Sequence, residues 1–522
     1  MMKEKYESLA VHDLKEIARS RGIKGVSAMK KADVIEVMLA LDEKEAGAQE
    51  ITEATESVPP QASHEKVKKE AAVKEKAPRD YGAREQTVRE QPSPQQRPYR
   101  NENGNGTRGD SQSRIVTTRN NDRYNSPYNK GTAPTTAADE DKFPAELDSG
   151  ITVSGILEVM SDGYGFIRSA NYLPGESDVY VAPSQIRRFG LKTGDILEGN
   201  TRVRTQNEKF SALLYVKRIN GYTPEVAARR FNFEDMTPIF PNSRLKMEKY
   251  GSSVAMRIVD LLSPIGKGQR GMIVSPPKAG KTTLLKEVAQ SVTSNYPEMH
   301  LIILLIDERP EEVTDIKETV EGPNVEVIYS TFDELPEHHK RVSEMVVERA
   351  KRLVEHKKDV MILLDSITRL TRAYNLVVPP SGRTLSGGID PAALHMPKRF
   401  FGAARNMREG GSLTILATAL VETGSKMDDV IYEEFKGTGN MELVLDRKLS
   451  EKRLFPAIDI QKTSTRREDL LLTAEEMEAI NIVRRALNGM KSDEAVDRIL
   501  DLFAKTRNNG EFVQTVKKMR FI

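Results

Sequence analysis

The sequence contains no cysteine, which excludes disulfide bonds and thiolate metal sites and fits a reducing compartment. It also lacks long apolar runs: stretches such as Leu301 to Ile306 are far shorter than the ~20 residues needed to span a bilayer. The opening stretch, from Met1 to Glu7, has no apolar signal-peptide core. We therefore expect a soluble, cytoplasmic protein without a membrane partner.

A net charge is nearly absent as well, because 79 Lys and Arg residues face 77 Asp and Glu residues, leaving a formal charge of +2. A polyanion partner cannot be inferred from so small a total, so any nucleic-acid surface must be local. At 522 residues the chain exceeds the roughly 250–300 residues at which a single core stops growing. We expect several domains.

Residues 1–42 are expected to form a small helical module. Two short stretches place apolar residues at helical spacing, and Gly22 is placed to end the first helix. Lysines between and before the helices fit either a nucleic-acid contact or an ordinary solvated face. The apolar positions are Leu9, Leu14, Ile17, Ala18, Val34, Ile35, Met38 and Leu39.

From Glu43 to Leu147 the polar residues and Pro and Gly dominate, and no apolar periodicity remains. Such a segment buries too little apolar surface to offset its ordering entropy, so we expect residues 43–147 to be a disordered insertion. Its second half scatters Arg and Tyr residues among Gly and Asn, which fits either contacts with RNA or an inert tether.

Short strands dominate residues 148–222. Thr152 to Met160 alternates, Asp162 and Gly163 favour a turn, and further strands are expected at 164–168, 178–181 and 208–216. About five such strands in roughly 70 residues predict a small closed barrel of the OB or cold-shock kind.

This barrel carries aromatic residues at alternate strand positions. Tyr164, Phe166 and Arg168 fall on one face of their strand, and Tyr180 stands beside Asp178 on another. Outward rings in line with an Arg predict a platform on which single-stranded bases stack. Aromatic packing between neighbouring strands is the alternative.

Beyond a connector at 223–265, near-continuous apolar strands alternate with helical stretches, of which Val342 to Glu355 is the clearest. The pattern predicts an α/β domain over 266–522, with a mostly parallel sheet covered on both faces. The expected strands are Gly271–Ser275, Leu301–Ile306, Val325–Ser330, Val360–Leu364, Ser412–Ala417 and Met441–Leu445.

A phosphate loop is expected directly after the first of these strands. Residues 275–282 match G-x-x-x-x-G-K-[ST], with Ser275 in place of the first Gly. Backbone N–H groups of such a loop point at phosphates, Lys281 reaches the β- and γ-phosphates of ATP, and Thr282 suits Mg²⁺. A Lys-capped turn between strand and helix is the alternative.

Two other strands end in carboxylates, at Glu308 and at Asp365. Ligands bind outside the carboxyl ends of parallel strands, so these acids are expected to converge with the phosphate loop. Asp365 fits a Mg²⁺ ligand acting through water, Glu308 a base or positioner for the attacking water, and Arg309 a cation for the γ-phosphate. A helix cap is the alternative for either acid.

Two polar loops are expected to leave the same edge of the sheet. Residues 378–388 carry Arg383, and residues 423–426 carry Lys426. Each fits either a contact with an RNA backbone or a plain surface turn. Beyond the last strand, Arg466 fits either a finger that reaches a neighbouring subunit's γ-phosphate or a solvated charge.

Together these stretches resemble the bacterial transcription termination factor Rho family. The resemblance runs from about Ile151 to the C-terminus, and the N-terminal module is also similar to that family. Ser275 agrees with it, since members commonly carry Ala there. The matching stretches are Asp162–Phe166, Pro276–Thr282, Ile306–Thr314, Leu364–Arg369, Pro397–Asn406 and Gly437–Glu442.

The resemblance implies a homohexameric ring with a RecA-type ATPase core. Such a ring binds nascent single-stranded RNA, hydrolyses ATP with Mg²⁺, moves 5′ to 3′ as a helicase and releases the transcript from bacterial RNA polymerase. The implied catalytic residues are Glu308, Lys281, Asp365 and, from the next subunit, Arg466; Thr282 and Asp365 would face Mg²⁺.

The resemblance also implies the binding residues. The nucleotide contacts are Gly266, Lys267, Gly268, Gln269, Arg270, Gly271, Lys278, Ala279, Gly280, Lys281, Thr282, Thr283, Arg309 and, near the adenine, Phe455. The primary RNA site is Gly163, Tyr164, Gly165, Phe166, Ile167, Arg168, Asp178, Val179, Tyr180, Glu208, Lys209 and Phe210, and the secondary site is Arg383, Thr384, Leu385, Ser386, Gly387, Gly388 and Lys426.

Two other classes of function compete with an RNA-dependent ATPase motor. One is a passive RNA-binding regulator whose ATPase core only assembles the ring; intact Lys281, Glu308, Asp365 and Arg466 disfavour it. The other is a subunit of the rotary-ATPase type, whose core is similar; the aromatic barrel disfavours it. RNA-stimulated ATP turnover separates the first class from the motor, and binding of single-stranded RNA separates the second.

Overall fold

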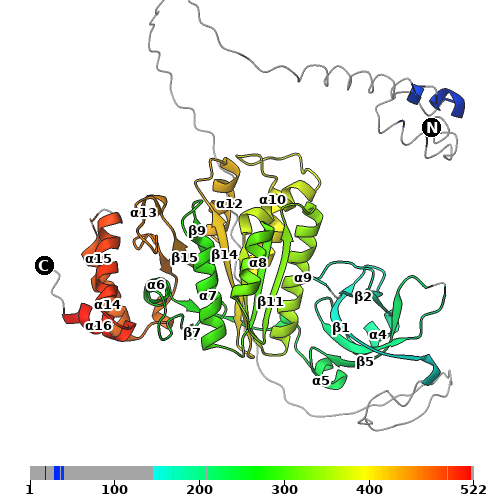
Figure 1. Cartoon of the computed structure of the whole chain (residues 1–522), viewed down its shortest axis with the longest axis horizontal. Helices are drawn as coiled ribbons and strands as arrows, with labels where there is room; N and C mark the ends of the chain where they lie inside the picture. Colours follow the sequence, from blue (N-terminus) through cyan, green and yellow to red (C-terminus); the bar gives the residue numbers. More distant parts are fainter. Residues whose placement is uncertain are drawn as a thin grey trace, which may run out of the picture. The chain divides into compact units, whose positions relative to one another are not determined.

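The computed structural model describes residues 14, 18, 29–35, 37–39, 145–168, 170–206, 208–488, 490 and 492–518 (Figure 1). Most of the expected helical module and of the expected insertion lies outside these residues. Within the module, Leu14, Ala18, Val34, Ile35 and Met38 form a small apolar cluster. Among the described helices, none is both long and apolar enough to cross a membrane.

The part of the structure that leads into the barrel starts at a 3₁₀ turn, η3 (Ala145–Leu147), which lies inside the segment expected to be disordered. A contact with a residue far away in the sequence holds it: Val203 N donates to the carbonyl of Leu147 and extends the neighbouring barrel strand by one hydrogen bond. The expected end of the insertion at Leu147 is therefore a few residues too late.

The predicted barrel is confirmed, with five strands closed in the order β1-β2-β3-β5-β4. Along its strands, residues that face the apolar core alternate with residues on the outer face. Ile167, Val179 and Val181 are therefore buried, as their strand positions predict. Residues 208–210 do not open the last strand, because Arg204 donates to the carbonyls of Glu208 and Lys209 and holds them in a loop. The elements are β1 (Asp148–Val159), β2 (Gly165–Arg168), β3 (Val179–Val181), α4 (Pro183–Phe189), β4 (Ile196–Arg202) and β5 (Ser211–Ile219).

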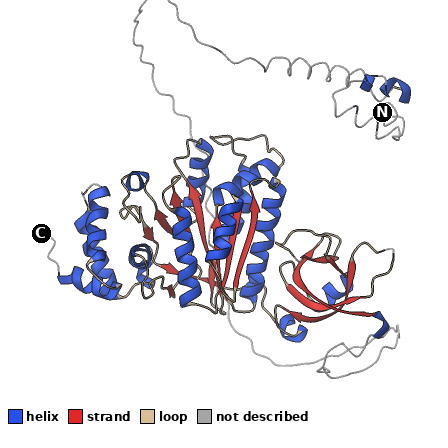
Figure 2. Ribbon diagram, in the orientation of Figure 1, coloured by secondary structure: helices blue, strands red, loops and turns tan. Residues whose placement is uncertain are grey.

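The larger domain is built on a sheet of order β11-β10-β12-β14-β9-β15-β16, whose central pairs are parallel (Figure 2). All six expected strands are present, which confirms the α/β prediction. They are β9 (Arg270–Ser275), β10 (His300–Glu308), β11 (Val325–Thr331), β12 (Asp359–Asp365), β14 (Ser412–Leu420) and β15 (Met441–Val444), joined by the short strands β6 (Pro238–Ile239), β13 (Arg405–Met407) and β16 (Ser464–Thr465).

Helices cover both faces of this sheet. On strand β10, for example, Leu301, Ile303 and Leu305 pack with one face, whereas Ile302, Leu304 and Ile306 pack with the other. The first face is covered by α6 (Val254–Leu262), α7 (Lys281–Asn295), α8 (Pro310–Thr319), α14 (Ala474–Leu487), α15 (Ser492–Ala504) and α16 (Asn509–Lys518), and the second by α9 (Pro336–Glu355), α10 (Ile367–Val377), α11 (Pro391–Gly402) and α12 (Lys426–Lys436).

The remaining described elements are short and lie in the connections. They are α5 (Pro224–Ala228), η4 (Phe233–Asp235), β7 (Arg244–Leu245), β8 (Ile265–Gly266), α13 (Arg447–Glu451) and η5 (Glu468–Leu470).

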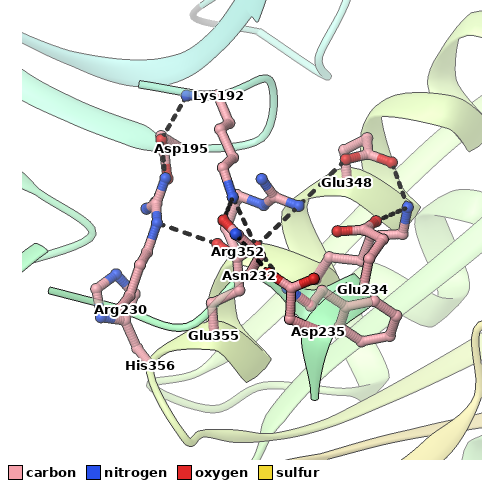
Figure 3. A network of polar contacts seen from close by, with 12 residues as sticks. Lys192, Asp195, Arg230, Asn232, Glu234, Asp235, Glu348, Arg352, Glu355 and His356 are labelled. Carbon is pink, nitrogen blue, oxygen red and sulfur yellow. Dashed lines mark hydrogen bonds and ion pairs between the residues drawn. The ribbon is translucent and has the colours of Figure 1, made fainter. Parts of the chain in front are cut away.

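A buried polar network joins the barrel, the connector and the end of α9 (Figure 3). Arg230 of the connector pairs with Asp195 of the barrel and, at 3.0 Å, with Glu355 of α9. Lys192 and Arg352 approach the same Glu355 carboxylate at 3.1 and 3.3 Å. Because each buried charge has a partner, the network specifies one seating of the barrel on the core.

His356 adds a pH-sensitive group to this junction. Its ring stacks on Tyr222 with centroids 4.6 Å apart, and its Nε2 lies 3.3 Å from Asn220 Nδ2. Burial, and then the charge of Arg230, lower the pKa of His356 from 6.5 to about 4. Between these two pKa values the unfolded chain binds a proton at His356 that the folded chain does not bind. The free energy of unfolding therefore decreases as the pH falls.

We expect His356→Gln to remove this part of the pH dependence. Between pH 7 and about pH 5 the wild type should lose about 1 kcal/mol more of its unfolding free energy than the variant, roughly half the full linkage because the ring is only half-buried. Urea unfolding at both pH values measures the difference. Equal losses in the two proteins would show that His356 is not the responsible group.

Candidate functional site

The phosphate loop follows β9 and ends at helix α7, which begins with Lys281. Gly280 precedes the helix with φ of 94°, a left-handed conformation that favours glycine. Ser275 has no positive φ and is fully buried at the end of the strand, where its Oγ lies 2.9 Å from the Pro276 carbonyl. The backbone there does not need the glycine of the usual pattern.

A β-bulge aims Glu308 at this loop. The register between β10 and β11 shifts between Ile306 and Glu308, and Asp307 adopts a positive φ of 57°. A bulge inserts one residue and re-aims the next side chain. Arg369 of α10 donates to the carbonyl and, at 2.8 Å, to the carboxylate of Asp307, which holds the bulge in place.

Lys281 lies between the two predicted carboxylates. Its Nζ is 2.8 Å from Glu308 Oε1 and 2.6 Å from Asp365 Oδ1. The carboxyl ends of β10 and β12 and the phosphate loop therefore do converge, as parallel strands require. Thr418 of β14 fixes Asp365 further by donating to the same oxygen at 2.7 Å.

Charges in this cluster shift one another's pKa values. Burial raises the pKa of Glu308, and the nearby Asp365 raises it further, while Lys281 opposes both. Burial disfavours the charge on Lys281, but Asp365 and Glu308 outweigh it, so the pKa of Lys281 is raised. A carboxylate with a raised pKa beside a fixed cation is suited to accepting a proton from water.

The donor set also suits Mg²⁺. The described residues contain no cluster of three or more His, Cys, Asp or Glu side chains that would hold a metal ion alone. The hydroxyl of Thr282 and the buried carboxylate of Asp365 are hard oxygen donors beside the phosphate loop. Mg²⁺ is commonly held by one or two such groups together with water and substrate phosphates.

Other predicted nucleotide contacts divide into two groups. Arg309 caps α8 next to Glu308, and the half-exposed ring of Phe455 lies beside Gly280, so both are near the loop. Residues 266–271 lie at the opposite edge of the sheet, where β9 begins and Lys267 pairs with Asp359 at 2.6 Å. Residues 266–271 and the phosphate loop therefore lie at opposite ends of β9 and do not meet within one chain.

Arg466 also lies at that opposite edge. It follows β16, whose Thr465 pairs with Met441 at the start of β15, and its backbone N donates to Asn440. Its side chain is exposed and has no ion-pair partner among the described residues. Arg466 thus does not reach the phosphate loop of its own chain.

Four aromatic rings gather on the barrel. Phe166 contacts Phe210, Tyr164 and Tyr180 with ring centroids 5.2, 5.8 and 6.0 Å apart, and all four rings are only half-buried. The rings do pack across strands, since Phe166 is paired with Tyr180 in the ladder, yet they leave faces open for bases. We call these four residues and Arg168 the aromatic platform.

Arg168 departs from its expected outward position. It is only 5% exposed, because its guanidinium lies over the Phe166 ring and is paired with Glu158 at 2.8 Å and with Asp178. Asp178 is buried too, and its Oδ1 has no hydrogen-bond partner among the described residues. Alternation predicts the face of the strand but not the acids that cover the Arg.

The two polar loops lie against each other. A side chain on Gly387 would meet the backbone of Met427 at 2.7 Å, so the loops touch where Gly387 stands. Arg383 and Lys426 are both exposed. Leu385 packs on the core, although no core pattern was expected in this loop.

Sequence reasoning missed Arg369, Thr418 and Glu158. Arg369 and Thr418 hold the bulge and Asp365, and Glu158 pairs with Arg168. Each lies on an element other than the one it supports, so no local pattern marks it. Of the three, only Arg369 could have been suspected from the sequence, because it lies in the first turn of the helix that follows Asp365.

Three family models match the chain. "Rho termination factor, N-terminal domain" matches residues 5–44, "Rho termination factor, RNA-binding domain" residues 153–225, and "ATP synthase alpha/beta family, nucleotide-binding domain" residues 255–465. The transcription termination factor Rho of Pseudomonas aeruginosa is 58% identical over 382 residues, covering 72% of this chain and 90% of that protein. The chain belongs to the transcription termination factor Rho family.

Another Rho protein, from Bacillus subtilis, is 56% identical over 372 residues, which cover 71% of this chain and 86% of its own. The matched Rho domains agree with the barrel and the α/β core described above. A solved structure of an ATPase from a type III secretion system overlaps with a TM-score of 0.46 at 20% identity, covering 61% of this chain and 93% of its own.

Proposed function

We propose that the chain is an RNA-dependent ATPase motor that moves 5′ to 3′ along nascent single-stranded RNA and releases it from RNA polymerase. Membership of the Rho family supports transcription termination and ATP hydrolysis directly. The observation that carries the finer proposal is the convergence of Lys281, Glu308 and Asp365 at one sheet edge, in a chain that also presents the aromatic platform.

In this proposal Glu308 accepts a proton from the water that attacks the γ-phosphate, and Lys281 leaves the two carboxylates to bind the phosphates. Arg309 and Phe455 contact the nucleotide, and Thr282 and Asp365 hold Mg²⁺, which when bound neutralises phosphate charge. Residues 266–271 and Arg466 act from another copy of the chain in a ring of identical subunits; their position at the sheet edge away from the phosphate loop supports this part of the proposal.

The aromatic platform is proposed to bind the RNA bases, with Glu208 as a hydrogen-bond acceptor beside it and Asp178 holding Arg168 in place. The exposed cations Arg383 and Lys426 are proposed to contact RNA in the channel of the ring. The cytoplasm is the proposed compartment, where RNA polymerase and its transcripts are found.

The deciding experiment is ATP hydrolysis with and without single-stranded RNA. We expect RNA to stimulate turnover. Unstimulated turnover would favour the rotary-ATPase type, and RNA binding without any turnover would favour the passive regulator.

Phe166→Ala is expected to weaken binding of single-stranded RNA by about 1–3 kcal/mol, because the ring at the centre of the platform no longer stacks on a base. Fluorescence anisotropy with a labelled oligoribonucleotide measures the change. The matched control is Phe231→Ala, which removes an exposed ring outside the platform. Equal affinities of wild type and Phe166→Ala would contradict the platform assignment.

A further inference from the structure

The acid that pairs with the platform's Arg168 also pairs with the ATPase core. Glu158 lies on β1 directly opposite Phe166 in the β1–β2 ladder. Its Oε2 accepts from Arg168 Nε at 2.8 Å and from Arg341 Nη2 of helix α9 at 2.7 Å. One carboxylate oxygen therefore joins a platform residue to a helix that packs on the catalytic sheet.

The charge balance at this point depends on the core. Within the barrel, the single guanidinium of Arg168 faces two carboxylates, Glu158 and Asp178, so this group carries a net negative charge. That charge repels the negatively charged backbone of RNA. Arg341 supplies the second guanidinium, and the group becomes neutral.

The contact of Arg341 is specific. Glu158 is its one ion-pair partner among the described residues, and its Nε is buried without a hydrogen bond. The barrel does not need this pair in order to stay on the core, since the network around Arg230 and Glu355 joins the two elsewhere (Figure 3). Loss of Arg341 should thus alter the platform without releasing the barrel.

We infer that Arg341 is a positioning residue for RNA binding: acting through Glu158, it neutralises the acidic surroundings of Arg168 and so completes the primary RNA site from the ATPase core. The inference rests on the proposed RNA platform. Linkage makes the effect reciprocal, so RNA bound at the platform favours the seating of α9 against the barrel.

Helix α9 also contacts the sheet close to the proposed nucleotide site. Two residues before Arg341, His339 Nδ1 lies 2.7 Å from Ser330 Oγ, at the end of β11. Where β11 pairs with β10, the next residue, Thr331, lies opposite Glu308. One helix thus contacts both the acid beside the platform and the strand next to the catalytic carboxylate.

Arg341→Gln tests the inference in the full-length protein, with a fluorescein-labelled RNA of about 12 nucleotides. We expect the Kd to rise about three- to tenfold, the size expected for one partly screened charge. The RNA concentration for half-maximal ATPase stimulation should rise in parallel, while turnover without RNA stays unchanged. Arg341→Lys should restore most of the affinity, because it keeps the charge.

Charge compensation gives the sharper test. The double variant Glu158→Gln with Arg341→Gln is again neutral around Arg168, so its Kd should return to within about twofold of the wild type. Lys192→Gln is the control, since it removes another barrel–core ion pair with no contact to the platform. An unchanged Kd for Arg341→Gln, or no recovery in the double variant, would overturn the inference.

Failure of the platform itself would look different. If Phe166→Ala and the wild type bind RNA equally, the proposed primary site is wrong and the inference falls with it. If Phe166→Ala weakens binding but Arg341→Gln does not, the platform stands and only the role of Arg341 is refuted.

Discussion

Arg466→Ala is expected to lower RNA-stimulated ATP turnover by about 10³–10⁵-fold while ATP binding is retained, the range seen for arginine fingers. The side chain is exposed and has no ion-pair partner among the described residues. It follows β16, beside the start of β15, and the strands of the sheet separate it from the phosphate loop of its own chain. It therefore serves catalysis only if it reaches the loop of a neighbouring copy.

Arg467 offers a matched control on the next residue. Its guanidinium is already paired with Asp469 at 2.9 Å, and that pairing raises its pKa, so Arg467→Ala should leave turnover within about threefold of the wild type. A large loss in Arg467→Ala and none in Arg466→Ala would reassign the finger.

Mixing two inactive variants tests action between subunits. Arg466→Ala keeps an intact phosphate loop, and Lys281→Ala keeps an intact Arg466. In mixed rings a loop from the first variant meets an Arg466 from the second, so ATP turnover should reappear on mixing. Turnover that stays absent at every mixing ratio would place the function of Arg466 within its own chain.

Glu308→Gln is expected to lower the rate of the hydrolysis step by about 10²–10⁴-fold, the usual contribution of a general base. The amide keeps the shape of the side chain and its place beside Lys281, but it accepts no proton. Single-turnover hydrolysis measures the step, and binding of a fluorescent ATP analogue should change little. A variant that retains wild-type single-turnover rates would exclude Glu308 as the base.

A pH profile and a neighbouring variant sharpen this test. Because burial and Asp365 raise the pKa of Glu308, the wild-type rate should fall toward acidic pH, and Glu308→Gln should lose that dependence. The control is Glu311→Gln, an exposed acid in the first turn of α8, which should leave the rate unchanged.

Much of the fold followed from periodicity. The apolar strands of the core alternate with helices, and the barrel strands alternate apolar with polar residues, so both architectures could be predicted. The predictions of where strands begin and end were less accurate, because contacts within loops, such as those of Arg204, determine these positions. The segment at 208–210 was misassigned for that reason.

At the nucleotide site, local sequence predicted Lys281, Glu308 and Asp365, since each stands at the end of an apolar strand or in a loop of recognisable pattern. It did not predict the bulge at Asp307 that turns Glu308 toward Lys281. Nor did it show that residues 266–271 lie at the far end of β9 from the phosphate loop, because a resemblance assigns contacts without saying which copy of the chain supplies them.

The sequence by itself determined the domain types, the phosphate loop, the acids at the strand ends and the rings of the platform, because each is a property of residues close together in the chain. Only the tertiary structure decided which charges meet. The burial of Arg168, its acid Glu158 and the partner Arg341 join residues far apart in sequence, and such contacts depend on how the barrel seats on the core. No local periodicity encodes that seating.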